Sequence, residues 1–126
     1  MHLAHVALWT TDVVAAAAFW RDYFGATVGE PYHSTRRVGF VSRFITLPGD
    51  GCIELMTGPW IAVAGSDDRI GWDHIALSLG SAAAVDALAA RCAADGVLVS
   101  APRTTGDGFY EAVLAMLDGT RVEITA

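Results

Sequence analysis

The chain contains almost the same short segment twice, and this repeat strongly limits the folds that it can adopt. The segments HVAL at residues 5–8 and HIAL at residues 74–77 differ by one methylene group. Each is an apolar run opened by a histidine, which is typical of a strand buried on at least one face. A histidine at the start of such a strand in each half of the chain predicts two copies of one structural module.

In the first half, a helix and further strands are expected to follow a strand at residues 2–9. Asp12 is a suitable N-cap for a helix that runs to about Phe24, and Gly25 stands where a C-terminal cap would. Residues 32–37 are polar and are expected to form a loop. The remaining elements are strands at residues 38–47 and 52–57, joined by a turn at 48–51. The apolar stripe of the helix consists of Val13, Ala16, Ala17, Trp20 and Phe24.

The second half repeats this order. A strand at residues 72–79 precedes a helix that Ser81 caps, that ends before Gly96 and that has Val85, Leu88 and Cys92 as its apolar stripe. Strands follow at 97–100, 110–116 and 120–125, and the Asp118-Gly119 pair predicts a tight hairpin turn between the last two. We therefore predict an α+β domain of two tandem β-α-β-β-β modules: module one at about 1–58, a linker at about 59–70 and module two at about 71–126.

Composition excludes several classes of protein. A chain of 126 residues fits one compact domain, and its net charge of −6 argues against a nucleic-acid or anionic-membrane surface. No apolar run reaches the length of a membrane span, and the N-terminal residues do not resemble a secretory signal. Two cysteines do not make a disulfide framework. We therefore expect a cytoplasmic protein with reduced cysteines and no nucleic-acid or membrane partner.

A second polar residue shares the spacing of the repeat. His5 and His74 are 69 positions apart, and so are Glu54 and Glu123 in the last predicted strand of each half. Taken singly, each of these residues has an ordinary explanation in the core or on the surface. Together they supply nitrogen and oxygen ligands suited to Zn, Ni, Co, Mn or Fe, with coordination positions left for water or substrate. The shared spacing favours a metal site.

Paired β-α-β-β-β modules with a histidine on the first strand and a glutamate on the last resemble the vicinal oxygen chelate superfamily. Its members include glyoxalase I, methylmalonyl-CoA epimerase, extradiol dioxygenases, and proteins of fosfomycin and bleomycin resistance. The resemblance covers essentially the whole chain and includes the Asp118-Gly119 turn before the strand of Glu123. It implies curved mixed sheets around a cleft in which His5, Glu54, His74 and Glu123 bind one divalent metal ion. In compact members of the superfamily a homodimer often completes this cleft, so that each site takes one His/Glu pair from each subunit.

The resemblance also narrows the reaction. A set of four protein ligands resembles that of glyoxalase I or the epimerase, whereas the dioxygenases and the fosfomycin-resistance proteins typically use three protein ligands. This implies a metal-dependent lyase or isomerase that abstracts a proton next to a carbonyl group and stabilises the resulting enediolate. Glu123 would be the catalytic base, with Glu54 as its counterpart. The alternatives are an acyl-CoA epimerase of the methylmalonyl-CoA type and a non-catalytic protein that sequesters an antibiotic or another small molecule.

Strand alternation extends the predicted site, because residues two positions from a ligand share its face of the sheet. Among them, Trp9, Met56 and Trp72 are candidate substrate-binding residues, and plain core packing explains them at least as well. Arg103 is a further candidate for binding an anionic substrate, and so are the loop residues His33, Arg36 and Arg37. The alternative is that these residues are solvated loop charges. Glu111 is either another cleft carboxylate or an exposed strand residue. The full set expected to face the cleft is Leu3, Ala7, Trp9, Cys52, Met56, Trp72, Ala76, Arg121 and Thr125.

The sequence departs from small bacterial glyoxalase I proteins at two positions. Those proteins have an arginine shortly after the first histidine and an asparagine shortly after the first glutamate, and both help to hold glutathione. The corresponding residues here are Trp9 and Gly58. The departure argues against a glutathione adduct as the substrate and leaves the metal ligands and the proton transfer unaffected.

Overall fold

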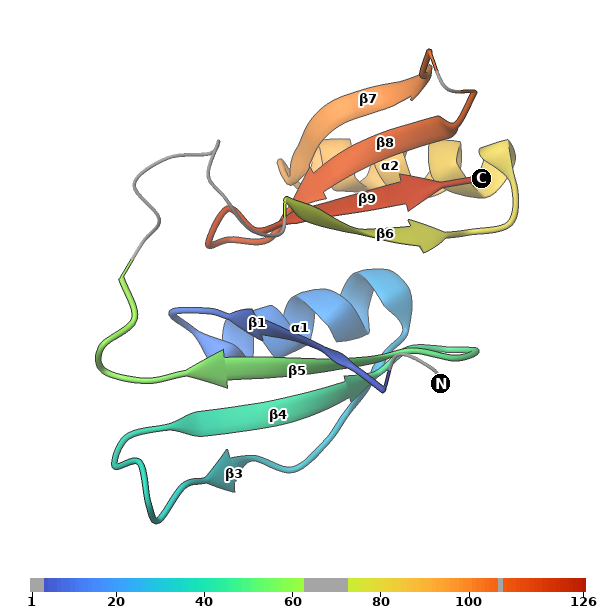
Figure 1. Ribbon diagram of the computed structural model, residues 1–126. Helices are drawn as coiled ribbons and strands as arrows, with labels where there is room; N and C mark the ends of the chain where they lie inside the picture. Colours follow the sequence, from blue (N-terminus) through green and yellow to red (C-terminus); the bar gives the residue numbers. More distant parts are fainter. Residues whose placement is uncertain (1–3, 63–72, 107) are drawn as a thin grey trace. The chain divides into compact units, whose positions relative to one another are not determined.

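The structure is a computed structural model that describes residues 4–62, 73–106 and 108–126. The chain divides into two compact units, residues 1–64 and 65–126. Each unit has a sheet with one helix packed against it, and in both the chain runs from a first strand through the helix to the remaining strands (Figure 1). The predicted α+β architecture of two similar modules is confirmed.

The first unit is a five-stranded mixed sheet with helix α1. The strand order is β1-β5-β4-β2, and β3 also pairs with β4. β1 and β5 are parallel, whereas the other pairs are antiparallel. The elements are β1 (Val6–Trp9), α1 (Val13–Phe24), β2 (Thr27–Val28), β3 (Tyr32–His33), β4 (Val41–Thr46) and β5 (Cys52–Thr57).

The second unit is a four-stranded mixed sheet with helix α2. Its order is β6-β9-β8-β7, in which only the pair of β6 and β9 is parallel. The elements are β6 (His74–Ser78), α2 (Ala82–Ala94), β7 (Leu98–Thr104), β8 (Tyr110–Ala115) and β9 (Arg121–Thr125).

In both units the first strand pairs in parallel with the last. Ala7 lies opposite Glu54 in the first unit, and Ala76 lies opposite Glu123 in the second. The repeat spacing found in the sequence therefore corresponds to one register used twice. This register determines which side chains of the two strands become neighbours.

The core of each unit lies between the sheet and its helix. On β5 the side chains of Ile53 and Leu55 are buried, and on β9 those of Val122 and Ile124 are buried. Because successive side chains of a strand point to opposite faces, the intervening glutamates point away from this core. Each sheet thus has one face closed by its helix and a second face, called here the open face, that carries Glu54 or Glu123.

The ends of both helices follow from local hydrogen bonds, as predicted. The Asp12 carboxylate accepts bonds from the backbone N–H groups of Val14 and Ala15, at 3.0 and 2.9 Å. Gly25 adopts a left-handed conformation, with φ of 64°, that ends α1. The Ser81 hydroxyl accepts a bond of 3.2 Å from Ala84 at the start of α2.

The predicted apolar stripes differ in detail from the buried residues. Phe24 and Leu88 are half-buried, whereas Phe19 and Ala89 belong to the core. The periodicity located the buried face of each helix correctly to within one residue.

Several predicted strand boundaries were wrong. β1 begins at Val6, so that His5 precedes the strand, and β3 occupies the start of the expected loop at residues 32–37. Two-residue strands such as β2 and β3 are too short to show an alternating pattern. β7 extends to Thr104 through Pro102, because it is an edge strand in which a missing backbone N–H is tolerated.

The predicted linker lies mostly in residues 63–72, which are outside the described residues. The same range includes Trp72. In the described part of the chain, neither helix is sufficiently long and apolar to span a membrane.

The two cysteines are free and differ in environment. Cys92 is completely buried on α2, and burial raises the pKa of its thiol to about 11. Cys52 is half-buried at the start of β5.

We expect iodoacetamide at pH 8 to alkylate Cys52 at least tenfold faster than Cys92 in the native protein. Only the thiolate reacts, and about one Cys92 thiol in a thousand is ionised at this pH, besides being shielded from solvent. Peptide mapping by mass spectrometry over time measures both rates. In guanidinium chloride the two rates should become similar, and equal rates in the native protein would contradict the buried position of Cys92.

Candidate metal centre

The first predicted ligand pair forms on the open face of the first unit. His5 directly precedes β1, two residues before Ala7, which lies opposite Glu54 in the parallel register. Nε2 of His5 is 3.8 Å from Oε2 of Glu54. The His5 ring also packs edge-on against Phe44, with centroids 5.4 Å apart. The parallel pairing thus brings together two side chains that are far apart in the sequence.

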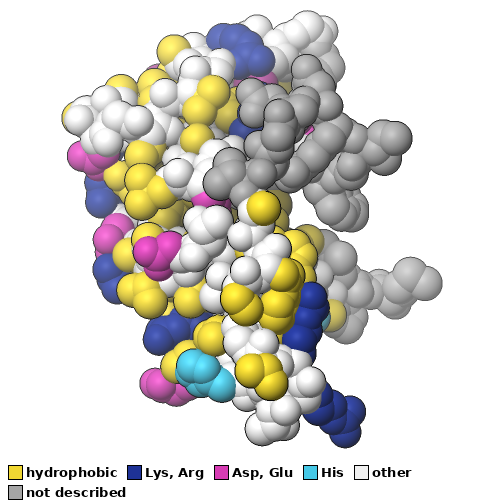
Figure 2. All heavy atoms as spheres, turned by 90° about the vertical axis from the view of Figure 1, so that its left-hand side faces the viewer, with side chains coloured by type: hydrophobic (Ala, Val, Ile, Leu, Met, Phe, Trp, Pro, Cys, Tyr) yellow, Lys and Arg dark blue, Asp and Glu magenta, His cyan; other side chains and the backbone are white. Residues whose placement is uncertain are grey.

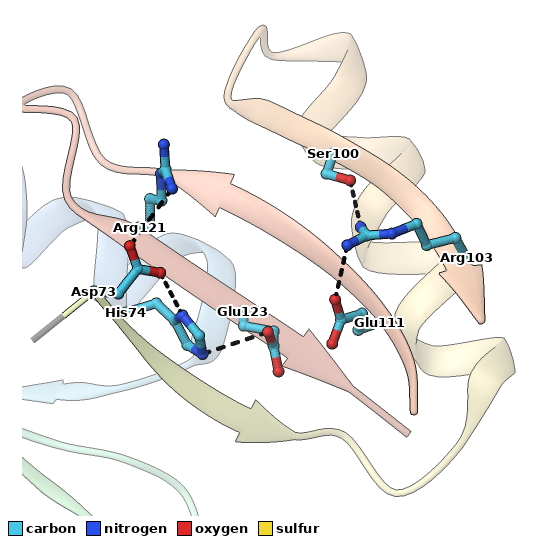
Figure 3. Close-up of polar contacts among 7 residues, drawn as sticks. All are labelled: Asp73, His74, Ser100, Arg103, Glu111, Arg121 and Glu123. Carbon is cyan, nitrogen blue, oxygen red and sulfur yellow. Dashed lines mark hydrogen bonds and ion pairs between the residues drawn. The ribbon is translucent and has the colours of Figure 1, made fainter. Parts of the chain in front are cut away.

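The second pair forms in the corresponding place of the second unit. His74 opens β6, two residues before Ala76, which lies opposite Glu123. Nε2 of His74 is 3.4 Å from Oε2 of Glu123 (Figure 3). The Glu123 side chain is 15% exposed, whereas the His74 ring is 39% exposed and accessible to a ligand.

Asp73 holds His74 in this orientation. An Asp73 carboxylate oxygen is 2.7 Å from Nδ1 of His74, and the other oxygen is 3.6 Å from Nη1 of Arg121 (Figure 3). The hydrogen bond from His74, followed by the charge of Arg121, lowers the pKa of Asp73. The carboxylate fixes the imidazole through Nδ1 and directs Nε2 toward Glu123.

Asp73 was not among the predicted site residues. The repeat provides no signal for it, because the residue 69 positions earlier is Ala4. The signal that could have found it is its position next to a candidate histidine ligand, since a carboxylate often accepts a hydrogen bond from the second ring nitrogen of such a histidine.

The geometry of both pairs fits shared metal ligands. Two atoms that are each about 2.1 Å from one metal ion lie about 3.0–3.4 Å apart, depending on the coordination angle. The second pair has this separation, and the first is a few tenths of an ångström wider. Within either unit, the described residues contain no cluster of three or more His, Cys, Asp or Glu side chains suited to a metal. Each unit therefore supplies one nitrogen and one oxygen, which is half of the predicted ligand set.

Arg103 contacts other side chains of its own unit. Its guanidinium lies 3.2 Å from Glu111 and donates a hydrogen bond of 2.6 Å to the hydroxyl of Ser100 (Figure 3). Glu111 is buried, which excludes the alternative of an exposed strand residue, and Arg103 compensates its charge. Arg103 remains a predicted substrate ligand, but the structure gives it a partner in the protein.

Two other predicted substrate-binding residues, Trp9 and Met56, lie on the first unit. Trp72 is outside the described residues. Trp9 is 42% exposed at the end of β1, and the register places it opposite the half-buried Met56 on β5. Because Trp9 follows Ala7 by two residues, it shares the open face with the His5/Glu54 pair. The structure thus brings Trp9, Met56 and this ligand pair onto one surface.

Sequence and structure comparisons identify the family. The family model described as the Glyoxalase/Bleomycin resistance protein/Dioxygenase superfamily matches residues 2–124. No curated protein matches the sequence significantly.

Several solved structures share the fold. A glyoxylase/bleomycin resistance protein/dioxygenase domain from Frankia sp. EAN1pec has a TM-score of 0.85 at 17% identity, covering 99% of this chain and 96% of that chain. A possible glyoxalase from Bacillus cereus has a TM-score of 0.73 at 25% identity, with 100% and 99% covered. The fosfomycin resistance protein FosX from Listeria monocytogenes, in complex with Mn(II) and sulfate, has a TM-score of 0.72 at 20% identity, with 99% and 91% covered.

The family model spans nearly the whole chain, and the division into two units, each with one mixed sheet and one helix, agrees with it. The chain belongs to the Glyoxalase/Bleomycin resistance protein/Dioxygenase superfamily and has its vicinal oxygen chelate fold.

Proposed function

We propose that the protein is a metal-dependent lyase or isomerase of the glyoxalase I type, which moves a proton next to a substrate carbonyl group. The observation that carries this proposal is the pairing of a histidine with a partly buried glutamate in the same register of both units. Structural relatives give independent support for a metal, since FosX was crystallised with Mn(II).

The proposed ligands of a single divalent metal ion are His5, Glu54, His74 and Glu123. When bound, the metal would polarise the substrate carbonyl and stabilise the negative charge that develops as the proton leaves. Asp73 would keep Nε2 of His74 unprotonated and directed at the metal by holding the proton on Nδ1. We further propose a cytoplasmic homodimer in which each site takes one His/Glu pair from each subunit.

Glu123 is the proposed catalytic base. Its carboxylate is largely shielded from solvent and emerges on the open face beside an exposed imidazole, where a substrate has access. Glu123 would accept the proton from the carbon next to the carbonyl and return it to the neighbouring carbon, so that no net proton is consumed. Glu54 has the equivalent position in the first unit and is the proposed counterpart base.

The metal proposal predicts stoichiometric binding and a defined role for Asp73. Adding Ni, Co, Mn or Zn to protein treated with EDTA should raise its melting temperature, because a ligand at 100 times its Kd stabilises the native state by about 2.7 kcal/mol.

Asp73→Asn should weaken metal affinity by about 10- to 100-fold, because a neutral amide replaces the charged carboxylate that accepts the hydrogen bond from the His74 imidazole. Calorimetric titration and elemental analysis measure both effects.

The matched control for this variant is Asp86→Asn. Asp86 accepts a hydrogen bond from Tyr110 away from His74, so its loss should leave metal affinity unchanged. Absence of stoichiometric metal, together with an unchanged melting temperature, would refute the four-ligand site. That outcome would instead favour a protein that sequesters a small molecule without catalysis.

The proposed base predicts a large effect on turnover. Glu123→Gln should lower kcat by about 10²- to 10⁴-fold, because the amide cannot accept the substrate proton. The assay follows methylglyoxal with several thiols, beside methylmalonyl-CoA, after reconstitution with metal. Glu30→Gln makes the same chemical change at an exposed loop residue and should retain full activity. Undiminished turnover of a correctly folded Glu123→Gln variant would exclude Glu123 as the base.

A further inference from the structure

An arginine lies against two indole rings on the first unit. The Arg37 guanidinium is 4.0 Å from the ring centroid of Trp60 and 5.6 Å from that of Trp9. Trp9 also packs edge-on against Phe40 at 6.0 Å, and Phe40 contacts Tyr32 at 6.4 Å. These five residues form what we call the Arg37 cluster. Figure 2 shows basic side chains beside hydrophobic ones on the face that includes the β3–β4 loop.

The loop that carries Arg37 has defined hydrogen bonds. The backbone N–H of Arg37 donates to the Ser34 hydroxyl at 2.9 Å, and its carbonyl accepts from Phe40 at 3.0 Å. Gly39 has φ of 86°, and a Cβ there would lie 2.8 Å from the ring of Pro59, so the loop packs tightly on the chain after β5. The loop backbone is therefore fixed before any ligand arrives, and the contact with Trp60 orients the guanidinium, which lowers the entropy cost of binding.

The indole of Trp60 occupies the space that a side chain at position 58 would need. A Cβ on Gly58 would lie 2.5 Å from the Trp60 ring. The two positions at which the sequence departs from glutathione-binding relatives, Trp9 and Gly58, therefore belong to one structural feature. Trp9 supplies one indole, and Gly58 makes room for the other.

The surroundings of Arg37 differ from those of three other arginines. Among the described residues no acidic side chain pairs with Arg37, whereas Arg21, Arg103 and Arg121 each lie beside a carboxylate. A guanidinium that stacks on aromatic rings keeps its N–H edge available for a carboxylate or another oxyanion.

The cluster lies on the same face of the sheet as the first ligand pair. Trp9 follows His5 by four residues, which corresponds to about 13 Å along a strand. A substrate of moderate size could therefore place one end at the ligand pair and the other at the Arg37 cluster.

We propose that the Arg37 cluster binds a flat aromatic group that carries an anionic substituent, and that it selects substrates of this class. The anion pairs with the N–H edge of Arg37, and the ring packs against the exposed parts of the Trp9 and Trp60 indoles, which are 42% and 40% exposed. The role of the Arg37 cluster in selecting substrates rests on the proposed function. Its ability to bind a ligand of this class can be tested separately.

The test is a calorimetric titration of the full-length protein with 2-naphthoate, compared with the neutral 2-naphthalenemethanol and the non-aromatic cyclohexanecarboxylate. We expect 2-naphthoate to bind at least tenfold more tightly than either, because only it offers both an anion and a flat ring. Arg37→Gln should weaken its binding about tenfold or more. Arg21→Gln, the same change on helix α1, where Arg21 pairs with Asp22, should alter affinity less than twofold.

Two further variants address the indole. Trp60→Leu should weaken 2-naphthoate binding severalfold, and Gly58→Ala should do the same by displacing the Trp60 ring. Equal affinity for 2-naphthoate and the neutral alcohol, or equal effects of the Arg21 and Arg37 variants, would overturn the proposal.

The titration is repeated with EDTA, which should leave the affinity for 2-naphthoate unchanged. Naphthoate binding by a protein that binds no metal would refute the proposed function and support the Arg37 cluster. Metal binding and turnover without naphthoate binding would refute the cluster alone.

Discussion

The parallel pairing of the first and last strands in each unit is the constraint on which the rest of the structure depends. Parallel neighbours cannot be joined by a tight turn, so the chain must cross over, and the helix of each unit makes part of that crossover. The helix closes one face of the sheet and buries Leu55 or Ile124 there. Polar side chains of the paired strands are thereby left to the open face, where one register places a histidine beside a glutamate in both units.

The two units share the ligand pair and differ in what surrounds it. In the second unit, Asp73 and Arg121 extend the His74/Glu123 pair into a chain of charged contacts. In the first unit, the equivalent histidine packs against Phe44, and the same strand continues to Trp9. The charged surroundings suit proton transfer, whereas the aromatic surroundings suit recognition of a flat substrate. The duplicated fold thus repeats one His/Glu pair in two different surroundings.

Features set by local sequence could be predicted, and features that depend on distant contacts could not. Helix caps at Asp12 and Ser81 and the Asp118-Gly119 turn rest on bonds between residues close in the chain. The proximity of each histidine to its glutamate could be predicted only because the repeat revealed a long-range relation. The short strand β3 exists through its pairing with β4, and the stack of Arg37 on Trp60 joins residues 23 positions apart with no counterpart in the second half. Neither leaves a periodic signal.

The contrast between Arg37 and Arg103 shows why an arginine near a site cannot be identified as a substrate-binding residue from the sequence alone. Glu111 faces the same side of the second sheet as Glu123, because Glu111 pairs with Thr125 and Val113 pairs with Glu123. Two carboxylates on one partly buried surface repel each other unless one is compensated. Arg103 supplies that compensation to Glu111, and its hydrogen bond to Ser100 holds it there. The charge of Arg103 is already matched within the protein. Among the described residues, Arg37 contacts aromatic faces and no carboxylate, which makes Arg37 the better partner for an anion from solution.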